Sequence, residues 1–338
     1  MSYQNLLILL LFLILFSCQG QTDLHTLTGR TMGTSYTVKV VGDLTDDKKD
    51  QLQQGIDQIL AKINQQMSTY QKDSELSKLN QFNEKTYYKI SNDLYQVIEK
   101  SILINQETDG AFDVTVGPLV NLWGFGPDKK RDIPPDRKEI EKIQGNIGTN
   151  LIELHHHLSQ IKKLRGDLYI DLSAIAKGYA VDKVSTYLKT KNLNDHMVEI
   201  GGEIRVAGYK AEDEKWSIAI EVPDPEKREI GKVIKVTNLS MATSGDYRNF
   251  FIYKGKRYSH TIDPRTGYPV THDLTAVSVF MKSCMNADAI ATGLMVMGPK
   301  KGMEFVNTNK IMAIFYLRTD QGFEEKISEA MKDLLNKN

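Results

Sequence analysis

Helical and strand patterns are interleaved along this chain without a regular strand–helix–strand repeat. Amphipathic helical spacing dominates the N-terminal part, whereas short stretches with strand character dominate residues 197–283. A doubly wound parallel sheet requires a regular alternation of strands and crossover helices, which this order does not provide. The sequence therefore predicts an α+β fold, with mixed or antiparallel sheets and flanking helices.

Five helices are predicted where apolar residues recur every three or four positions. The clearest begins after Thr45, which is a suitable N-cap, and continues to Met67. The other four are expected from Ser91 to a stop at Gly110, at 174–189, at 286–297 and at roughly 324–335.

Strands are predicted where apolar residues alternate or form short runs between turn residues. These segments are 31–41, 151–155, 160–164, 167–170, 197–200, 204–207, 216–221, 233–237, 241–244 and 276–281. Residues 250–253 and 257–261 flank a Lys-Gly pair and are expected to form a hairpin. Residues 126–137 are charged and rich in proline, which predicts a surface loop.

The N-terminus carries an unbroken apolar run at residues 6–16, followed by Ser17 and Cys18. A helix needs about 20 apolar residues to cross a bilayer, so this run is too short to span one. A run of this kind before a small residue is typical of a secretory signal peptide. The cysteine that follows resembles the lipobox of bacterial lipoproteins, in which this residue is lipidated. The alternative is a buried apolar N-terminal helix.

The lipobox resemblance predicts an exported protein that is lipid-anchored to a bacterial membrane and faces the periplasm. Residues 1–17 would be removed, residues 18–26 would form a lipidated tether, and residues 27–338 would form the folded domain. With Cys18 lipidated, the only other cysteine is Cys284, so no intramolecular disulfide is expected.

Charge composition and the absence of familiar motifs exclude several classes of protein. The chain has 43 Lys and Arg against 43 Asp and Glu, so no nucleic-acid partner is expected. It has no phosphate loop, no Gly-x-Gly-x-x-Gly turn and no His-Glu-x-x-His motif. His155, His156 and His157 suggest a metal site, but neighbours on a strand point to opposite faces. We therefore interpret the three histidines as side chains on an exposed strand.

A polar segment at 171–182 is a candidate anion-binding site. A predicted strand ends at Asp171, and small residues lead from it into a predicted helix. The first N–H groups of a helix have no partner within the helix and suit phosphate binding. Lys177 lies in the first turn, where a cation is unfavourable unless an anion lies beside it.

Three other segments are unusually polar or rich in glycine. Asp288 and Thr292 are one helical turn apart and could supply two oxygen ligands to Mg²⁺, although Asp288 could instead cap its helix. His260, Asp263 and Arg265 surround a proline turn, and turn chemistry alone does not explain the His and Arg. Residues 110–118 and 122–126 form a glycine-rich, aromatic stretch against which a planar ring could pack.

Together these segments resemble the ApbE family, the FAD:protein FMN transferases. The motifs occur in that family's order, and the resemblance covers about residues 27–320 of the chain. They are Thr-Met-Gly-Thr at 31–34, Met-Ser-Thr-Tyr at 67–70 with Ser-Glu-Leu at 74–76, Gly-Ala-Phe-Asp at 110–113, Asp-Leu-Ser-Ala-Ile-Ala-Lys-Gly at 171–178, Glu-Ile-Gly-Gly-Glu at 199–203, Ser-Gly-Asp-Tyr-Arg at 244–248, His-Thr-Ile-Asp-Pro-Arg-Thr-Gly at 260–267 and Asp-Ala-Ile-Ala-Thr at 288–292.

The resemblance implies a specific set of site residues. Asp288 and Thr292 would bind Mg²⁺ through their side chains, and Ala174 through its backbone carbonyl. The residues expected to line the pocket for FAD, the substrate, are Met32, Tyr70, Ala111, Phe112, Asp113, Asp171, Lys177 and Ile262.

The implied reaction is attack by a Ser or Thr hydroxyl of an acceptor protein, such as a subunit of a redox complex, on the FMN phosphorus of FAD. AMP would leave, Mg²⁺ would neutralise the diphosphate through Asp288, and His260 is the candidate base. His260 could instead only hydrogen-bond Asp263. The sequence leaves two further readings open, a Mg²⁺-dependent FAD pyrophosphatase and a non-catalytic flavin-binding lipoprotein. The metal ligands argue against the second, since a binder needs no metal at the diphosphate.

Overall fold

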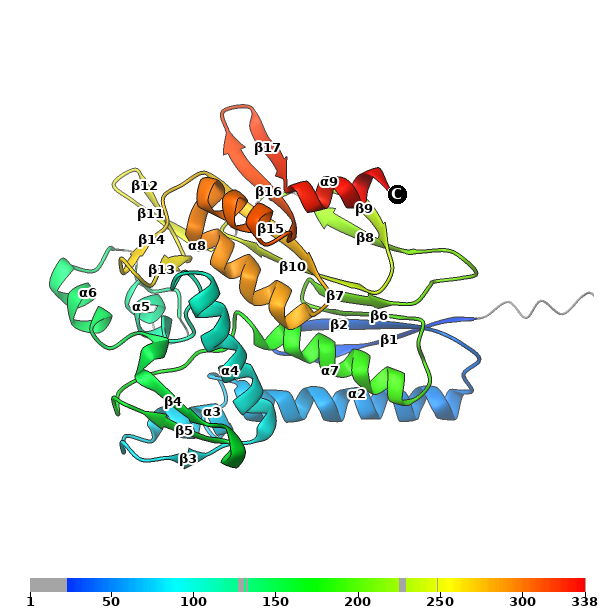
Figure 1. Cartoon of the computed structure of the whole chain (residues 1–338), viewed down its shortest axis with the longest axis horizontal. Helices are drawn as coiled ribbons and strands as arrows, with labels where there is room; N and C mark the ends of the chain where they lie inside the picture. The colour runs from blue at the N-terminus through cyan, green and yellow to red at the C-terminus, as the bar shows by residue number, and fades with distance from the viewer. Residues whose placement is uncertain (1–22, 127–130, 132, 225–228, 248, 338) are drawn as a thin grey trace, which may run out of the picture.

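The computed structural model describes residues 23–337, except 127–130, 132, 225–228 and 248. The fold is built around one antiparallel sheet of eight strands in the order β1-β2-β6-β7-β10-β15-β16-β17 (Figure 1). The strands are β1 (Leu24–Thr31), β2 (Thr34–Val41), β6 (His196–Ile200), β7 (Glu203–Ala207), β10 (Leu239–Gly245), β15 (Leu274–Met281), β16 (Met312–Thr319) and β17 (Gly322–Ile327). This architecture confirms the predicted α+β class.

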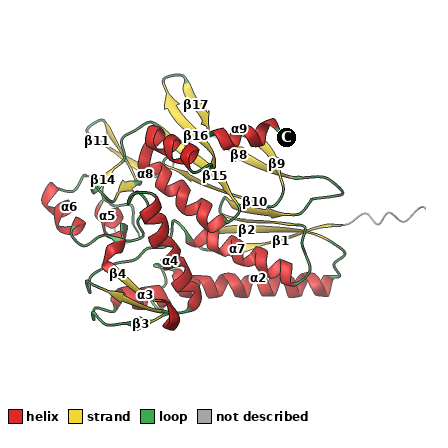
Figure 2. Cartoon of the chain, in the orientation of Figure 1, coloured by secondary structure: helices red, strands yellow, loops and turns green. Residues whose placement is uncertain are grey.

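The two faces of the sheet bury separate apolar cores, because successive strand residues point to opposite sides. On β15, Val277 and Val279 belong to one core, whereas Ala276 and Phe280 belong to the other. The larger core is covered by α2 (Asp46–Met67), α4 (Asn92–Glu107), α7 (Ala176–Thr190) and α8 (Cys284–Thr308). The smaller core lies under β8 (Trp216–Glu221), β9 (Ile230–Val236) and α9 (Glu329–Asn336). Figure 2 distinguishes the helices that cover the sheet from its strands by colour.

Short elements gather at one end of the molecule, away from the point where β1 begins (Figure 1). They are α3 (Glu75–Gln81), β3 (Tyr88–Lys89), α5 (Gly117–Leu122), α6 (Arg137–Gln144), β4 (Ile152–His155), β5 (Gln160–Lys163), β11 (Phe250–Tyr253), β12 (Lys256–Ser259), β13 (Ile262–Asp263) and β14 (Tyr268–Pro269). Leu119, Trp123, Ile140 and Ile262 form a small third core that ties several of these elements together.

The N-terminal part of the domain differs from the sequence-based prediction. The strand expected at 31–41 is confirmed from Thr34 as β2, but Thr31 ends the preceding strand β1. The two strands form a hairpin whose turn is Met32-Gly33, both with positive φ (49° and 74°). Residues 24–26 pair with residues 39–41 of β2, so they belong to the sheet and not to a tether. The apolar run at 6–16 and Cys18 lie outside the described residues, among which no helix is long and apolar enough to span a bilayer.

One other expected element is wrong, and another is confirmed only in its C-terminal part. Residues 167–170 form no strand, because the backbone of Ile170 bonds the side chain of Asn80 and the carbonyl of Leu168 accepts from Lys163. The expected helix at 324–335 is the end of β17 followed by α9, since the Ser328 hydroxyl caps a new helix there. The hairpin at 250–261 is confirmed as β11 and β12, and Lys254-Gly255 form its turn with positive φ (48° and 76°).

Candidate functional site

The N-termini of α7 and α8 cross at Gly178, and each helix is capped by a carboxylate from the other. Asp288 of α8 accepts a hydrogen bond from the N–H of Gly178 at 3.0 Å. Asp182 of α7 accepts from the N–H groups of Cys284 and Met285, both at 3.1 Å. A β-carbon at Gly178 would lie 2.7 Å from the carbonyl carbon of Cys284, so only glycine permits this approach.

This arrangement corrects two parts of the sequence-based interpretation. The N-terminal N–H groups of α7 are not all free for a phosphate, because Asp288 occupies that of Gly178. The side chain of Ser283, not Asp288, caps α8 by accepting from the N–H of Asn286 at 3.3 Å. Asp288 thus joins two helices that are distant in sequence.

Lys177 lies between two buried carboxylates at the start of α7. Its ammonium nitrogen is 3.0 Å from Glu203 Oε1 and 3.9 Å from Asp288 Oδ1, and both acids are only 3% exposed. Burial favours the neutral amine, but the two carboxylates outweigh it and raise the pKa of Lys177 above its ordinary value. Burial also raises the pKa of Glu203, and the charge of Asp288 adds to that effect. Glu203 and Asp288 thus supply the negative charge that stabilises Lys177 at the N-terminus of α7.

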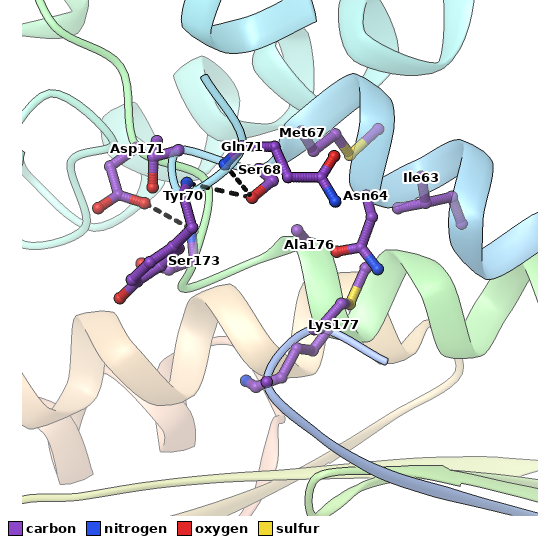
Figure 3. Close-up of a pocket in the computed structure, with 13 residues that line it drawn as sticks. Ile63, Asn64, Met67, Ser68, Tyr70, Gln71, Asp171, Ser173, Ala176 and Lys177 are labelled. Atoms are coloured by element: carbon purple, nitrogen blue, oxygen red, sulfur yellow. Dashed lines mark hydrogen bonds between the residues drawn. The ribbon is translucent and has the colours of Figure 1, made fainter. Parts of the chain in front are cut away.

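Two cavities meet at Asp171, Ser173 and Lys177. The larger has a volume of about 650 Å³ and lies between the end of α2 and the start of α7 (Figure 3). The smaller has a volume of about 350 Å³ and reaches from Lys177 to β10, α8 and the segment that contains His260. Pockets for small molecules and cofactors typically measure 300–1,000 Å³, so the pair can hold an elongated ligand.

The residues expected to line a ligand pocket all face these cavities. Met32 and Tyr70 line the larger one, and Tyr70 leaves 74% of its surface exposed at its rim. Asp171 and Lys177 line both cavities. The smaller cavity is lined by the remaining four, Ala111, Phe112, Asp113 and Ile262.

The three expected metal ligands, Ala174, Asp288 and Thr292, all line the smaller cavity. Asp288 Oδ1 is too far from Lys177 for a hydrogen bond, and Thr292 Oγ1 lies 3.1 Å from Ser244 Oγ. A carboxylate, a hydroxyl and a backbone carbonyl are oxygen donors of the kind that Mg²⁺ prefers. The residues present therefore fit a magnesium ion at this wall.

The ring of His260 has a defined tautomer. Its Nδ1 lies 3.0 Å from the backbone carbonyl of Asn249, which can only accept, so Nδ1 carries the proton and Nε2 keeps its lone pair. Burial lowers the pKa of His260 below its ordinary value and favours the neutral ring. The alternative reading, a hydrogen bond to Asp263, is wrong, because the ring bonds the Asn249 carbonyl and the Asp263 carboxylate bonds Arg265 instead. His260 lines the smaller cavity and can act there as a base.

The histidine run at 155–157 lies elsewhere. Only His155 is in a strand, whereas His156 and His157 are exposed in a short 3₁₀ turn, so the expectation that a strand carries all three is wrong. His156 Nδ1 lies 3.4 Å from Glu99. Within the described part of the chain, no group of three or more His, Cys, Asp or Glu could hold a metal.

Two carboxylates of this arrangement received no role from the sequence. Glu203 was recognised only as part of a motif, and Asp182 only as the end of a polar segment. A signal was available for Glu203, since it follows Gly201-Gly202 directly at the start of β7. Arg248 of the same motif set lies outside the described residues.

Residues 32–315 match the ApbE family. The chain belongs to the ApbE family. The FAD:protein FMN transferase of Vibrio cholerae serotype O1 is 43% identical over 327 residues, which cover 96% of this chain and 97% of that protein. The matched residues therefore include all those that line the two cavities.

Solved ApbE structures share the fold. The flavin transferase ApbE from Vibrio cholerae superposes with a TM-score of 0.84 at 42% identity, covering 92% of this chain and 99% of that one. The apo form of the flavinyl transferase ApbE from Pseudomonas stutzeri gives a TM-score of 0.85 at 35% identity, covering 94% and 98%. The eight-stranded sheet and its helices are therefore the ApbE fold.

Proposed function

We propose that this chain transfers FMN from FAD to a Ser or Thr hydroxyl of an acceptor protein. The proposal rests on one observation: the same cavity is lined by Asp288, Thr292, Ala174, Lys177 and His260. The adjoining larger cavity gives room for the rest of a dinucleotide. The curated relatives are named FAD:protein FMN transferase, which agrees with this reading.

The reaction exchanges one phosphorus–oxygen bond for another. The acceptor hydroxyl oxygen bonds to the FMN phosphorus, the bond from that phosphorus to the bridging oxygen breaks, and AMP leaves with that oxygen. His260 Nε2 takes the hydroxyl proton, because its lone pair is free while Nδ1 is held by Asn249. Lys177 places positive charge beside the diphosphate. Mg²⁺, when bound by Asp288, Thr292 and the Ala174 carbonyl, supplies further positive charge there.

The function is tested by incubating the protein with FAD and Mg²⁺, with and without an acceptor domain. We expect fluorescent flavin covalently bound to the acceptor, with a mass increment of one FMN less one water, together with one AMP per transfer. FMN and AMP released equally fast without the acceptor would show a pyrophosphatase instead. Bound but unaltered FAD in both samples would show a flavin-binding protein without catalysis.

Replacing Lys177 with methionine tests its contact with the diphosphate. We expect the affinity for FAD to fall by about tenfold to a hundredfold, because a charge-assisted hydrogen bond of about 1.5–3 kcal/mol is lost. Because a cation in the first turn of a helix is unfavourable, helix electrostatics alone would leave the ligand-free variant no less stable. The ion pairs with Glu203 and Asp288 overturn that expectation, since both carboxylates lose their counter-charge.

The measurements for this variant are FAD titration and thermal melting without ligand. Lys183→Met on the same helix is the matched control, because Lys183 pairs with Asp93 at 3.0 Å outside both cavities. Unaltered FAD affinity in Lys177→Met would reject the contact, and a melting temperature equal to wild type would reject the ion-pair argument.

His260→Ala is expected to lower kcat by about a hundredfold or more while FAD binding persists, since a positioned base contributes about 10²–10⁴ to a rate. The wild-type rate should stay high at pH 7 and fall only on acidification below the ordinary pKa of about 6.5, because burial lowers the pKa of His260. Full transfer by the variant, or a wild-type rate that falls between pH 8 and 7, would exclude this base.

We also propose that the chain is exported and lipid-anchored through Cys18. The proposal rests on the apolar run before Ser17 and on a chain that enters the folded domain at β1, which leaves residues 18–23 as a short connection. Cys18→Ser should leave catalysis unchanged and move the protein from the membrane fraction to the soluble fraction. If the variant stays with membranes after a high-salt wash, the anchor is wrong.

A further inference from the structure

His260 is held from one side by a single backbone atom. The carbonyl oxygen of Asn249 accepts both from the His260 backbone N–H, at 3.1 Å, and from its Nδ1, at 3.0 Å. The orientation of the imidazole in the smaller cavity therefore depends on where the Asn249 carbonyl lies. Whatever fixes that carbonyl also fixes Nε2.

Asp246 and Arg257 form a clamp between the two chain segments that enter this pair. Arg257 donates from Nη1 to Asp246 Oδ2 at 2.7 Å and from Nη2 to the Asp246 backbone carbonyl at 2.6 Å. Asp246 precedes Asn249 by three residues, and Arg257 precedes His260 by three residues. One guanidinium thus ties together the starts of both segments.

The clamp also anchors the β11–β12 hairpin to the central sheet. This hairpin forms a separate two-stranded sheet, and an isolated hairpin is only marginally stable. Asp246 is 3% exposed, and its N–H donates to the carbonyl of Thr275 on β15 at 2.9 Å. Arg257 extends from β12 and also covers the ring of Phe250 on β11, 4.3 Å from its centroid. The hairpin is therefore fixed to β15 through Asp246.

We propose that Asp246 and Arg257 are positioning residues, which hold the Asn249 carbonyl so that the proton of His260 stays on Nδ1 and its Nε2 faces the smaller cavity. This inference rests on the proposed function of His260 as the base. Neither residue is required to touch the substrate. The competing explanation is that the pair only stabilises the fold.

The first test is Arg257→Gln in the full folded domain. We expect kcat for FMN transfer to fall by about tenfold or more, with the dissociation constant for FAD within a factor of two of wild type. In a protein labelled with ¹⁵N-histidine, the His260 signals should change from a single Nδ1–H tautomer to a mixture. Lys232→Gln is the matched control, because Lys232 is as buried as Arg257 (28% and 25% exposed) and pairs with Glu325 away from the cavities. It should change neither readout.

The second test separates positioning from stability. In a His260→Ala background, Arg257→Gln should lower kcat no further, because residues that act through one group are not additive. An equal loss in both backgrounds, or an unchanged His260 tautomer in Arg257→Gln, would overturn the proposal.

Two milder variants serve if Arg257→Gln does not fold. Arg257→Lys keeps the charge but cannot span both Asp246 oxygens, and Asp246→Asn keeps the shape, so both should show an intermediate loss of kcat. Wild-type kcat in both would reject the clamp. The tautomer readout needs no turnover, so a failure of the proposed function would leave it informative.

Discussion

Asp288→Asn is expected to lower FMN transfer by about a hundredfold to a thousandfold at ordinary Mg²⁺ concentrations. The substitution removes the charge from one of two side-chain oxygen donors at the smaller cavity, and a metal contributes several kcal/mol to such a transition state. Kinetics at increasing Mg²⁺ should show a higher concentration at half-maximal rate. An unchanged rate in a well-folded variant would reject Asp288 as a ligand.

Asp182→Asn is the matched control for this prediction. Asp182 caps α8 as Asp288 caps α7, but it does not line either cavity. We expect its replacement to lower the melting temperature and to leave the dependence on Mg²⁺ unchanged. A carboxylate exposed in a cleft could be removed with little loss of stability, but Asp288 is not of that kind. Because it is 3% exposed and caps α7, asparagine is a better test than alanine.

Gly178→Ala is expected to destabilise the protein by about 1–3 kcal/mol or more, as overpacking does in well-packed interiors. The new β-carbon would lie 2.7 Å from the carbonyl carbon of Cys284 and 2.8 Å from the α-carbon of Met285. Both are backbone atoms, so relief requires α7 and α8 to separate. That separation would also move Lys177 away from Asp288, and transfer should fall together with stability.

Chemical denaturation and thermal melting measure this effect. Gly145→Ala is the control, because Gly145 has a negative φ (−66°) and a β-carbon there would meet its nearest atom at 4.0 Å. It should change the free energy of unfolding by less than about 0.5 kcal/mol. A Gly178→Ala variant as stable as wild type would show that the helices can part at no cost.

Local patterns in the sequence predicted the elements whose signals are local. The apolar face of α2 and the Lys-Gly turn of β11–β12 could be read directly, because each depends on residues within a few positions. β1 was missed because it is an edge strand with mostly exposed or half-exposed side chains, and its two leucines, Leu24 and Leu27, are not spaced as a strand requires. Ser328 could be recognised as an N-cap, but the predicted helix was begun at residue 324, which lies within β17.

The site was predictable as a set of residues but not as an arrangement. Asp288, Thr292 and Lys177 were identified from short motifs, and the structure brings all three to one cavity. The bond between Asp288 and Gly178 joins positions 110 residues apart, so no local spacing records it. The counter-charge of Glu203 on Lys177 is equally non-local. For this reason the sequence predicted which of these side chains lie at the cavity but not the electrostatic cost of removing them.

β1 separates the point where the chain enters the folded domain from the larger cavity. Its eight residues run from Leu24, where the chain enters the domain, to Thr31, immediately before Met32 at the larger cavity. At about 3.3 Å per residue, this strand holds the cavity roughly 25 Å from the entry point. Pairing of β1 with β2 along its whole length makes this spacing rigid. The point where the chain enters the folded domain and the larger cavity therefore keep a constant separation, because they lie at opposite ends of one paired strand.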